Sequence, residues 1–138
     1  MRRLATTLAL AFAAFSANAQ PADSSEQLVE RWKQAVSAKD ANAYQALFAY
    51  ADPKDKAALA GRFKMRVDAK RGAVRIMPFS TYEKMYNDAL KRGIKSPVEP
   101  KAWLVVEYAS QSLPGGGTST ETDVFLIGMK DGKYVFSS

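Results

Sequence analysis

The C-terminal third of the chain constrains the fold most, because strand-like runs alternate there with two strong turn signals. Residues 102–112 and 119–129 are rich in apolar and β-branched side chains, and the sequence PGGG lies between them. Asp131-Gly132 is a two-residue hairpin signal, and residues 133–138 provide the last run. The pattern predicts an antiparallel meander of three strands.

Hairpin geometry also predicts which residues pair. A loop centred on Gly115 pairs residues whose numbers sum to about 230, which places Glu107 opposite Asp123, and the second turn pairs Met129 with Tyr134. The first face of the meander then holds Trp103, Val105, Phe125, Ile127, Met129, Tyr134 and Phe136, and the second holds Leu104, Val106, Tyr108, Val124, Leu126 and Val135. Antiparallel sheets usually keep one polar face, so two apolar faces require a second cover. A second copy of the chain is the simplest cover; the last helix and a bound ligand are the others.

The preceding residues predict mainly helices. Helix starts are expected at Asp23-Ser-Ser-Glu26, at Asp40, at Asp52-Pro53 and at Ser80-Thr-Tyr-Glu83, each followed by apolar residues at helical spacing. The third helix is expected to be short, over residues 53–64, and Gly93 is expected to end the fourth. Between them, residues 65–67 and 74–77 alternate around Lys70-Arg71-Gly72 and predict a small hairpin.

This order of elements, with the phrases AVSAKDANAYQALF and VFLIGMKDGKYVF, resembles the nuclear transport factor 2-like (SnoaL-like, cystatin-like) superfamily. The resemblance covers nearly all of residues 24–138. It implies an α+β fold in which a curved antiparallel sheet wraps the N-terminal and central helices as a cone, with a pocket between them. Superfamily members include isomerases, dehydratases, subunits of larger enzymes and binding modules, so the resemblance implies no single function.

The N-terminus has the pattern of an export signal. Arg2 and Arg3 precede the apolar run LATTLALAFAAF, and Ala17-Asn18-Ala19 is an A-x-A cleavage site. We therefore expect a cleaved signal peptide over residues 1–19 and one mature domain over residues 20–138, periplasmic or secreted. No later run is long and apolar enough to serve as a stable membrane anchor, and export argues against nucleic acid as a partner. Since the chain has no cysteine, packing alone must stabilise it.

Composition excludes several chemistries. With neither histidine nor cysteine, the chain lacks the usual nucleophile dyads and zinc ligands, and no phosphate-binding loop is present. We expect no metal and no cofactor. The remaining catalytic candidates are Glu107 and Asp123, which resemble the carboxylates of ketosteroid isomerases when a tyrosine lies nearby. The alternative is that both carboxylates lie near the polar end of the sheet and are hydrated.

Two further residue sets are candidates for binding. The aromatic set consists of Trp32, Phe48, Phe79, Tyr82, Tyr86 and Trp103, which either line an apolar ligand pocket or form the core. The basic set, Arg62, Lys64 and Arg66, forms a stripe that either docks an anionic partner or is an ordinary hydrated surface.

Three functions remain from the sequence. The leading one is an exported, non-catalytic binding or accessory domain, a homodimer through its sheet, that takes a small apolar ligand or an envelope protein. The first alternative is a carboxylate-dependent isomerase or dehydratase of a small apolar substrate. The second is an envelope protein of the immunity or inhibitor type.

Overall fold

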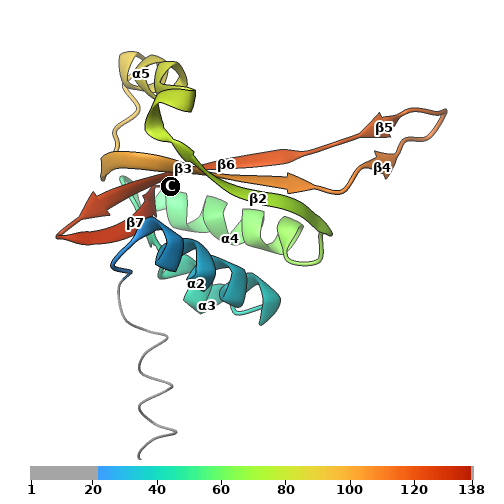
Figure 1. Cartoon of the computed structure of the whole chain (residues 1–138), viewed down its shortest axis with the longest axis horizontal. Helices are drawn as coiled ribbons and strands as arrows, with labels where there is room; N and C mark the ends of the chain where they lie inside the picture. Colours follow the sequence, from blue (N-terminus) through green and yellow to red (C-terminus); the bar gives the residue numbers. More distant parts are fainter. Residues whose placement is uncertain (1–21, 138) are drawn as a thin grey trace, which may run out of the picture.

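The computed structural model describes residues 22–137 and shows an α+β domain whose sheet carries helices on both faces (Figure 1). The five-stranded sheet has the order β1-β7-β6-β3-β2, and every neighbouring pair is antiparallel except β1 with β7. Its strands are β1 (Phe48–Ala49), β2 (Arg71–Pro78), β3 (Glu99–Tyr108), β6 (Thr122–Lys130) and β7 (Lys133–Ser137). The expected signal peptide falls outside the described residues. Within them, no helix has the length and apolar character needed to cross a membrane.

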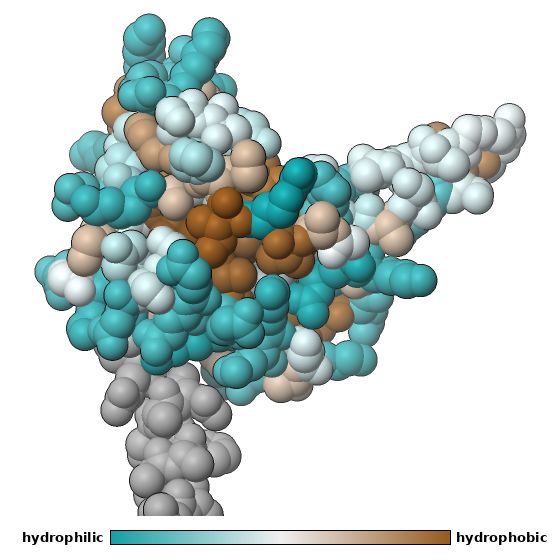
Figure 2. Space-filling model, in the orientation of Figure 1, coloured by the Kyte–Doolittle hydropathy of each residue, from teal (hydrophilic) through white to brown (hydrophobic). Residues whose placement is uncertain are grey.

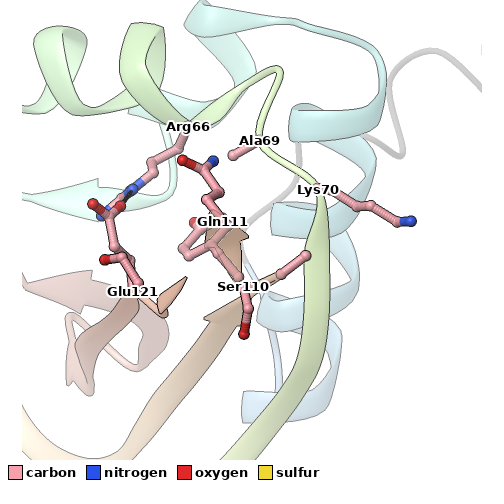
Figure 3. A pocket seen from close by; sticks show the side chains of 9 residues that line it. Arg66, Ala69, Lys70, Ser110, Gln111 and Glu121 are labelled. Atoms are coloured by element: carbon pink, nitrogen blue, oxygen red, sulfur yellow. Dashed lines mark hydrogen bonds and ion pairs between the residues drawn. The ribbon is translucent and has the colours of Figure 1, made fainter. Parts of the chain in front are cut away.

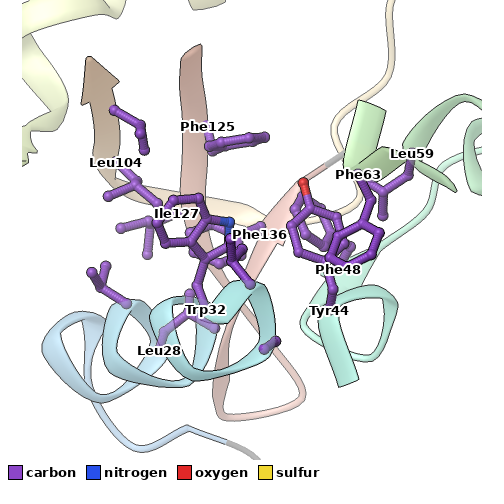
Figure 4. Close-up of a cluster of buried hydrophobic side chains, with 14 of the residues drawn as sticks. Leu28, Trp32, Tyr44, Phe48, Leu59, Phe63, Leu104, Phe125, Ile127 and Phe136 are labelled. Atoms are coloured by element: carbon purple, nitrogen blue, oxygen red, sulfur yellow. The ribbon is translucent and has the colours of Figure 1, made fainter. Parts of the chain in front are cut away.

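The first face of the sheet is covered by the helices α2 (Ser25–Ser37), α3 (Ala41–Gln45) and α4 (Lys54–Arg66). Helix α2 begins one residue later than the predicted box, because Ser24 Oγ accepts the Gln27 amide at 3.0 Å. Helix α3 begins as predicted, with Asp40 accepting the Ala43 amide at 3.0 Å. Figure 4 shows the core that these helices form with the sheet, where Trp32, Phe48 and Phe136 are buried.

The second face is covered by the chain itself, through the 3₁₀ turn η1 (Phe79–Tyr82) and the helix α5 (Glu83–Lys91). Gly93 ends α5 as predicted, with a φ of +83° that glycine adopts without strain. Because α5 lies across the sheet from α2, α3 and α4, the sheet does not wrap the N-terminal and central helices together (Figure 1). The α+β class is confirmed, whereas the cone expected from the resemblance is not.

The small hairpin predicted at residues 65–77 is wrong. Helix α4 continues to Arg66, since Leu59, Phe63 and Val67 form an apolar stripe with a spacing of four residues that packs on the core. Strand β2 instead pairs with β3, so that Ile76 lies opposite Leu104. A three-residue alternation fits a helix as well as a strand, and only the long-range pairing decides between them.

The predicted register is correct next to both turns and wrong in the β3–β6 pairing of the main sheet. Strands β4 (Gln111–Ser112) and β5 (Thr118–Ser119) form a separate exposed ribbon, in which Gln111 pairs with Ser119 as expected (Figure 1). We call residues 109–120 the arm. At its base the register shifts by one residue, so that in the main sheet Glu107 pairs with Thr122 and Asp123 pairs with Val106. The β6–β7 pairing of Met129 with Tyr134 is as predicted.

This one-residue shift changes the composition of the two faces, because neighbouring residues of a strand point to opposite sides. Phe125 and Ile127 join Leu104, Val106 and Tyr108 on the face that packs against α2, α3 and α4. Trp103 lies on the other face with Leu126, Val124 and Val135. Both faces are therefore apolar, as the sequence predicts, although the predicted membership was wrong.

Strand β2 is one edge of the sheet, and the two-residue strand β1 is the other. Figure 2 shows apolar surface in the middle of the view, below β2, with hydrophilic surface around it. Val74 and Ile76 of β2 are half-buried against the core. Arg71 and Arg75 lie on the same strand, and cations on an edge disfavour pairing with a second copy of that edge. The homodimer stays a prediction.

Candidate functional site

The two candidate carboxylates lie on opposite faces of the sheet. Glu107 is on the second face, where its carboxylate accepts a hydrogen bond of 2.5 Å from the exposed Arg75 guanidinium. Asp123 is on the first face, between the sheet and α4. The structure therefore does not bring the two carboxylates together, and the cross-strand pair on which the catalytic hypothesis depends is not formed.

Asp123 is part of a compact polar cluster at the end of α4. Arg66 donates from Nε and Nη2 to the two carboxylate oxygens at 3.1 and 3.2 Å, and Tyr108 donates its hydroxyl at 3.0 Å. The Arg66 guanidinium also lies over the Tyr108 ring, 4.6 Å from its centre. The side chains of Arg66 and Asp123 are 22% and 12% exposed. Asp123 thus has its hydrogen-bonding capacity largely used, which suits a structural role.

The tyrosines of this region are expected to resist ionisation at alkaline pH. Burial raises the pKa of Tyr44 to about 12, and burial followed by the negative charge of Asp123 raises the pKa of Tyr108 as well. In the unfolded chain both ionise near ~10. The two neutral phenols therefore make their full contribution to the free energy of unfolding below about pH 10. This contribution is lost as the pH rises through the folded pKa, by on the order of 2 kcal/mol for Tyr44.

An absorbance titration of tyrosinate checks this expectation. Of the six tyrosines, Tyr44 and Tyr108 are buried and should ionise only together with alkaline unfolding. In Tyr44→Phe the alkaline loss of stability should be smaller. Simultaneous ionisation of all six in the folded protein, near the ordinary value of ~10, would contradict the burial described above.

A cleft of about 250 Å³ lies at the base of the arm, beside this cluster (Figure 3). Arg66 and Glu121 face each other across it and form an ion pair, whereas Lys70 points away. The hydrogen bond to Glu121 raises the pKa of the Arg66 guanidinium. Since the charges that face the cleft neutralise each other, it has little left with which to bind a charged ligand.

The aromatic candidates separate into two sets. Trp32 and Phe48 belong to the core under α2 and α3, where they are buried and cannot line an open pocket. Phe79, Tyr82, Tyr86 and Trp103 gather on the second face. The Phe79 ring stacks on Trp103 at 5.9 Å, and Tyr82 meets the same indole edge-on at 5.7 Å.

Trp103 positions this second set through its polar edge. Its indole Nε1–H donates to the Phe79 carbonyl at 2.8 Å, which fixes the start of η1 on the sheet. The chain that returns after α5 approaches β6 closely at Gly128, where an added Cβ would overlap the Val98 side chain. The Trp103–Phe79 hydrogen bond and the close approach at Gly128 together set the distance between α5 and the second face of the sheet.

An apolar groove of about 210 Å³ opens between α5 and the second face of the sheet. Its lining residues are Met85, Tyr86, Ala89, Leu90, Ile94, Lys95, Ser96, Trp103, Leu126 and Ser137. Met85, Leu90 and Ile94 are 46%, 44% and 55% exposed, although they are large apolar side chains. We call this feature the α5 groove. It contains two of the six predicted aromatic residues, Tyr86 and Trp103.

Sequence patterning missed the exposed rim of this groove. Met85, Ala89 and Leu90 follow the helical stripe of α5, and such a stripe predicts core. Ile94 and Lys95 lie beyond Gly93, outside any regular element. The rim is identified by the exposure of its apolar side chains. That exposure depends on the distance between α5 and the sheet.

The predicted basic stripe does not form one surface. Arg66 is held by Asp123 and Glu121, and the Arg62 guanidinium lies over the Phe125 ring at 5.5 Å. Lys64 is exposed and lies about 200° from Arg62 around the α4 axis. Among residues 22–137, no group of three or more carboxylate, histidine or cysteine side chains is placed to hold a metal ion.

Comparison with known proteins adds no relative: no family model, no curated protein and no solved structure matches the chain. The class of protein that the fold and the α5 groove define is a small α+β domain with an apolar groove on one sheet face.

Proposed function

We propose that the mature domain is an exported, non-catalytic binding module that takes an apolar group in the α5 groove. The observation that carries this proposal is the exposure of Met85, Leu90 and Ile94 around a concave apolar surface. Large apolar side chains that gather at one concave place typically mark a binding site. Export is supported by the basic and apolar N-terminal pattern followed by Ala17-Asn18-Ala19.

The geometry of the carboxylates favours binding over acid–base catalysis. Glu107 is hydrated and paired with Arg75, while Asp123 is engaged by Arg66 and Tyr108. Neither of these carboxylates lines the α5 groove, and the ionisable side chains that do are Lys95 and Tyr86. Lys95 at the apolar rim can orient a ligand, but no carboxylate lines the groove, so carboxylate-dependent proton transfer has no base there.

The test is titration of the mature protein with N-phenyl-1-naphthylamine, an uncharged apolar dye that fluoresces on leaving water. Recovered from a periplasmic extract, the chain is expected to begin at Gln20, which intact mass measurement checks. The dye should bind at one site, and Leu90→Glu should weaken its binding at least about tenfold, because a carboxylate at the rim must lose water when the dye enters.

Met65→Glu is the matched control. Met65 is 75% exposed on α4, on the other side of the sheet, so the same change of charge there should leave dye affinity unaltered. Equal affinities of the two variants, or no dye binding by the unmodified chain, would overturn the proposal. So would a dimer in native mass spectrometry that Leu90→Glu dissociates, because the groove would then belong to a second copy.

A further inference from the structure

The size of the α5 groove limits the shape of its ligand. At about 210 Å³ it is smaller than the roughly 300–1,000 Å³ of sites that enclose drug-sized molecules. Its floor is Trp103 and Leu126, and its rim includes Leu90 and Ile94. A narrow open groove of this kind fits one flexible alkyl chain.

The charges near the groove are positive at one end. Lys95 lines the groove itself, and Lys91 and Arg92 end α5 just before it. Two of the carboxylates near the groove are paired with other cations: Asp88 pairs with Lys84 at 2.9 Å, and Glu99 pairs with Lys101 at 3.1 Å. Glu83 lies at the opposite end of α5 from Lys91. Within residues 22–137, Lys95 has no ion-pair partner.

We propose that the α5 groove binds a single-chain anionic amphiphile, with its alkyl chain on Trp103 and Leu126 and its head group beside Lys95. This inference rests on the proposed function and adds the ligand class. Apolar walls recognise the chain, and the ammonium group of Lys95 recognises the anion. A fatty acid in the form of its carboxylate is the simplest molecule with both properties.

The concave shape favours a single amphiphile over a membrane surface. A helix that lies on a bilayer presents its apolar face outward, whereas α5 turns Tyr86 toward the sheet, where its ring meets Phe79 at 5.3 Å. The remaining exposed apolar side chains form the rim of a hollow into which one alkyl chain fits. The test must therefore distinguish binding of a single amphiphile from binding to a lipid vesicle.

The experiment is titration of the mature protein with sodium octanoate, decanoate and dodecanoate below their micelle concentrations, followed by calorimetry and by NMR. Affinity should rise about fourfold for each added methylene that the groove buries, which corresponds to ~0.8 kcal/mol per CH₂. The indole N–H signal of Trp103 should shift, while that of Trp32, buried in the helix-side core, should not.

Head-group recognition is tested with decyltrimethylammonium and decyl maltoside, which have the same chain with a cationic and a neutral head. Decanoate should bind at least about fivefold more tightly than either. Lys95→Gln should abolish this preference, so that decanoate and decyl maltoside bind the variant with equal affinity. Lys56→Gln, an exposed cation on α4, is the matched control and should change neither affinity.

The outcomes distinguish the two proposals. If the dye binds but decanoate has no advantage over decyl maltoside, the ligand class is wrong and the binding module stands. If neither dye nor decanoate binds, both proposals fail. Binding to phosphatidylglycerol vesicles without binding of monomeric decanoate would assign α5 to a membrane surface and overturn the inference.

Discussion

Replacing Phe136 by alanine is expected to lower the free energy of unfolding by about 3–5 kcal/mol. Phe136 of β7 is 0% exposed, and its ring centre lies 5.1 Å from that of Phe48 and 5.8 Å from that of Phe125. It joins the short parallel strand β1 to the sheet, where it pairs with Phe48. Truncation to alanine removes these apolar contacts and leaves a cavity between β1, β6 and β7. The backbones of these strands cannot move far enough to fill it.

Urea denaturation of the mature protein, followed by circular dichroism, measures this loss. Phe136→Leu should cost less, because it keeps most of the buried volume. Met65→Ala is the control at an exposed apolar position and should stay within about 0.5 kcal/mol. An equal loss in Met65→Ala and Phe136→Ala would mean that the core does not lie where the structure has it.

The second large effect concerns the polar cluster under α4. Arg66→Met is expected to destabilise the protein by about 3 kcal/mol, because the half-buried Asp123 would lose its cation while remaining shielded from water. Arg75→Met is the matched control on the second face, where Arg75 and Glu107 are both well hydrated. That variant should cost less than about 1 kcal/mol.

A double-mutant cycle separates the ion pair from general packing. Asp123→Asn keeps an acceptor for the Tyr108 hydroxyl and removes the charge. Arg66→Met combined with Asp123→Asn should therefore cost at least about 1 kcal/mol less than the sum of the two single changes. Strict additivity would show that Arg66 and Asp123 do not interact. Asp123 would then again be a candidate for a carboxylate that is free to act in acid–base chemistry.

The distinction between Glu107 and Asp123 shows where sequence reasoning reached its limit. The turn around Gly115 predicts the pairing of Gln111 with Ser119 correctly. It does not predict the extra residue between the arm and β3, which moves Asp123 to the helix face. A bulge depends on how the strand end packs, here with the Ala109 amide donating to the Lys70 carbonyl at 2.8 Å. The local sequence carries no signal for that contact.

The partners of Asp123 show the same limit for side chains. Arg66 lies 57 residues from Asp123 along the chain, at the end of a helix that continues past its predicted end. The sequence predicts a tyrosine near the carboxylates without identifying which one, and in the structure Tyr108 contacts Asp123. Tyr108 and Arg66 together hold the Asp123 carboxylate in place. The sequence alone could not distinguish such a structural hydrogen bond from a catalytic one.

The sequence by itself determined the α+β class, the α3 start at Asp40, the β6–β7 hairpin and the apolar character of both sheet faces, because hydrophobic periodicity, capping and turn chemistry act over a few residues. Only the tertiary structure decided that η1 and α5 cover the second face, that Trp32 and Phe48 are core, and that an apolar groove remains beside Trp103. Those properties depend on the distances between elements that are far apart in the chain, and local patterning does not encode those distances.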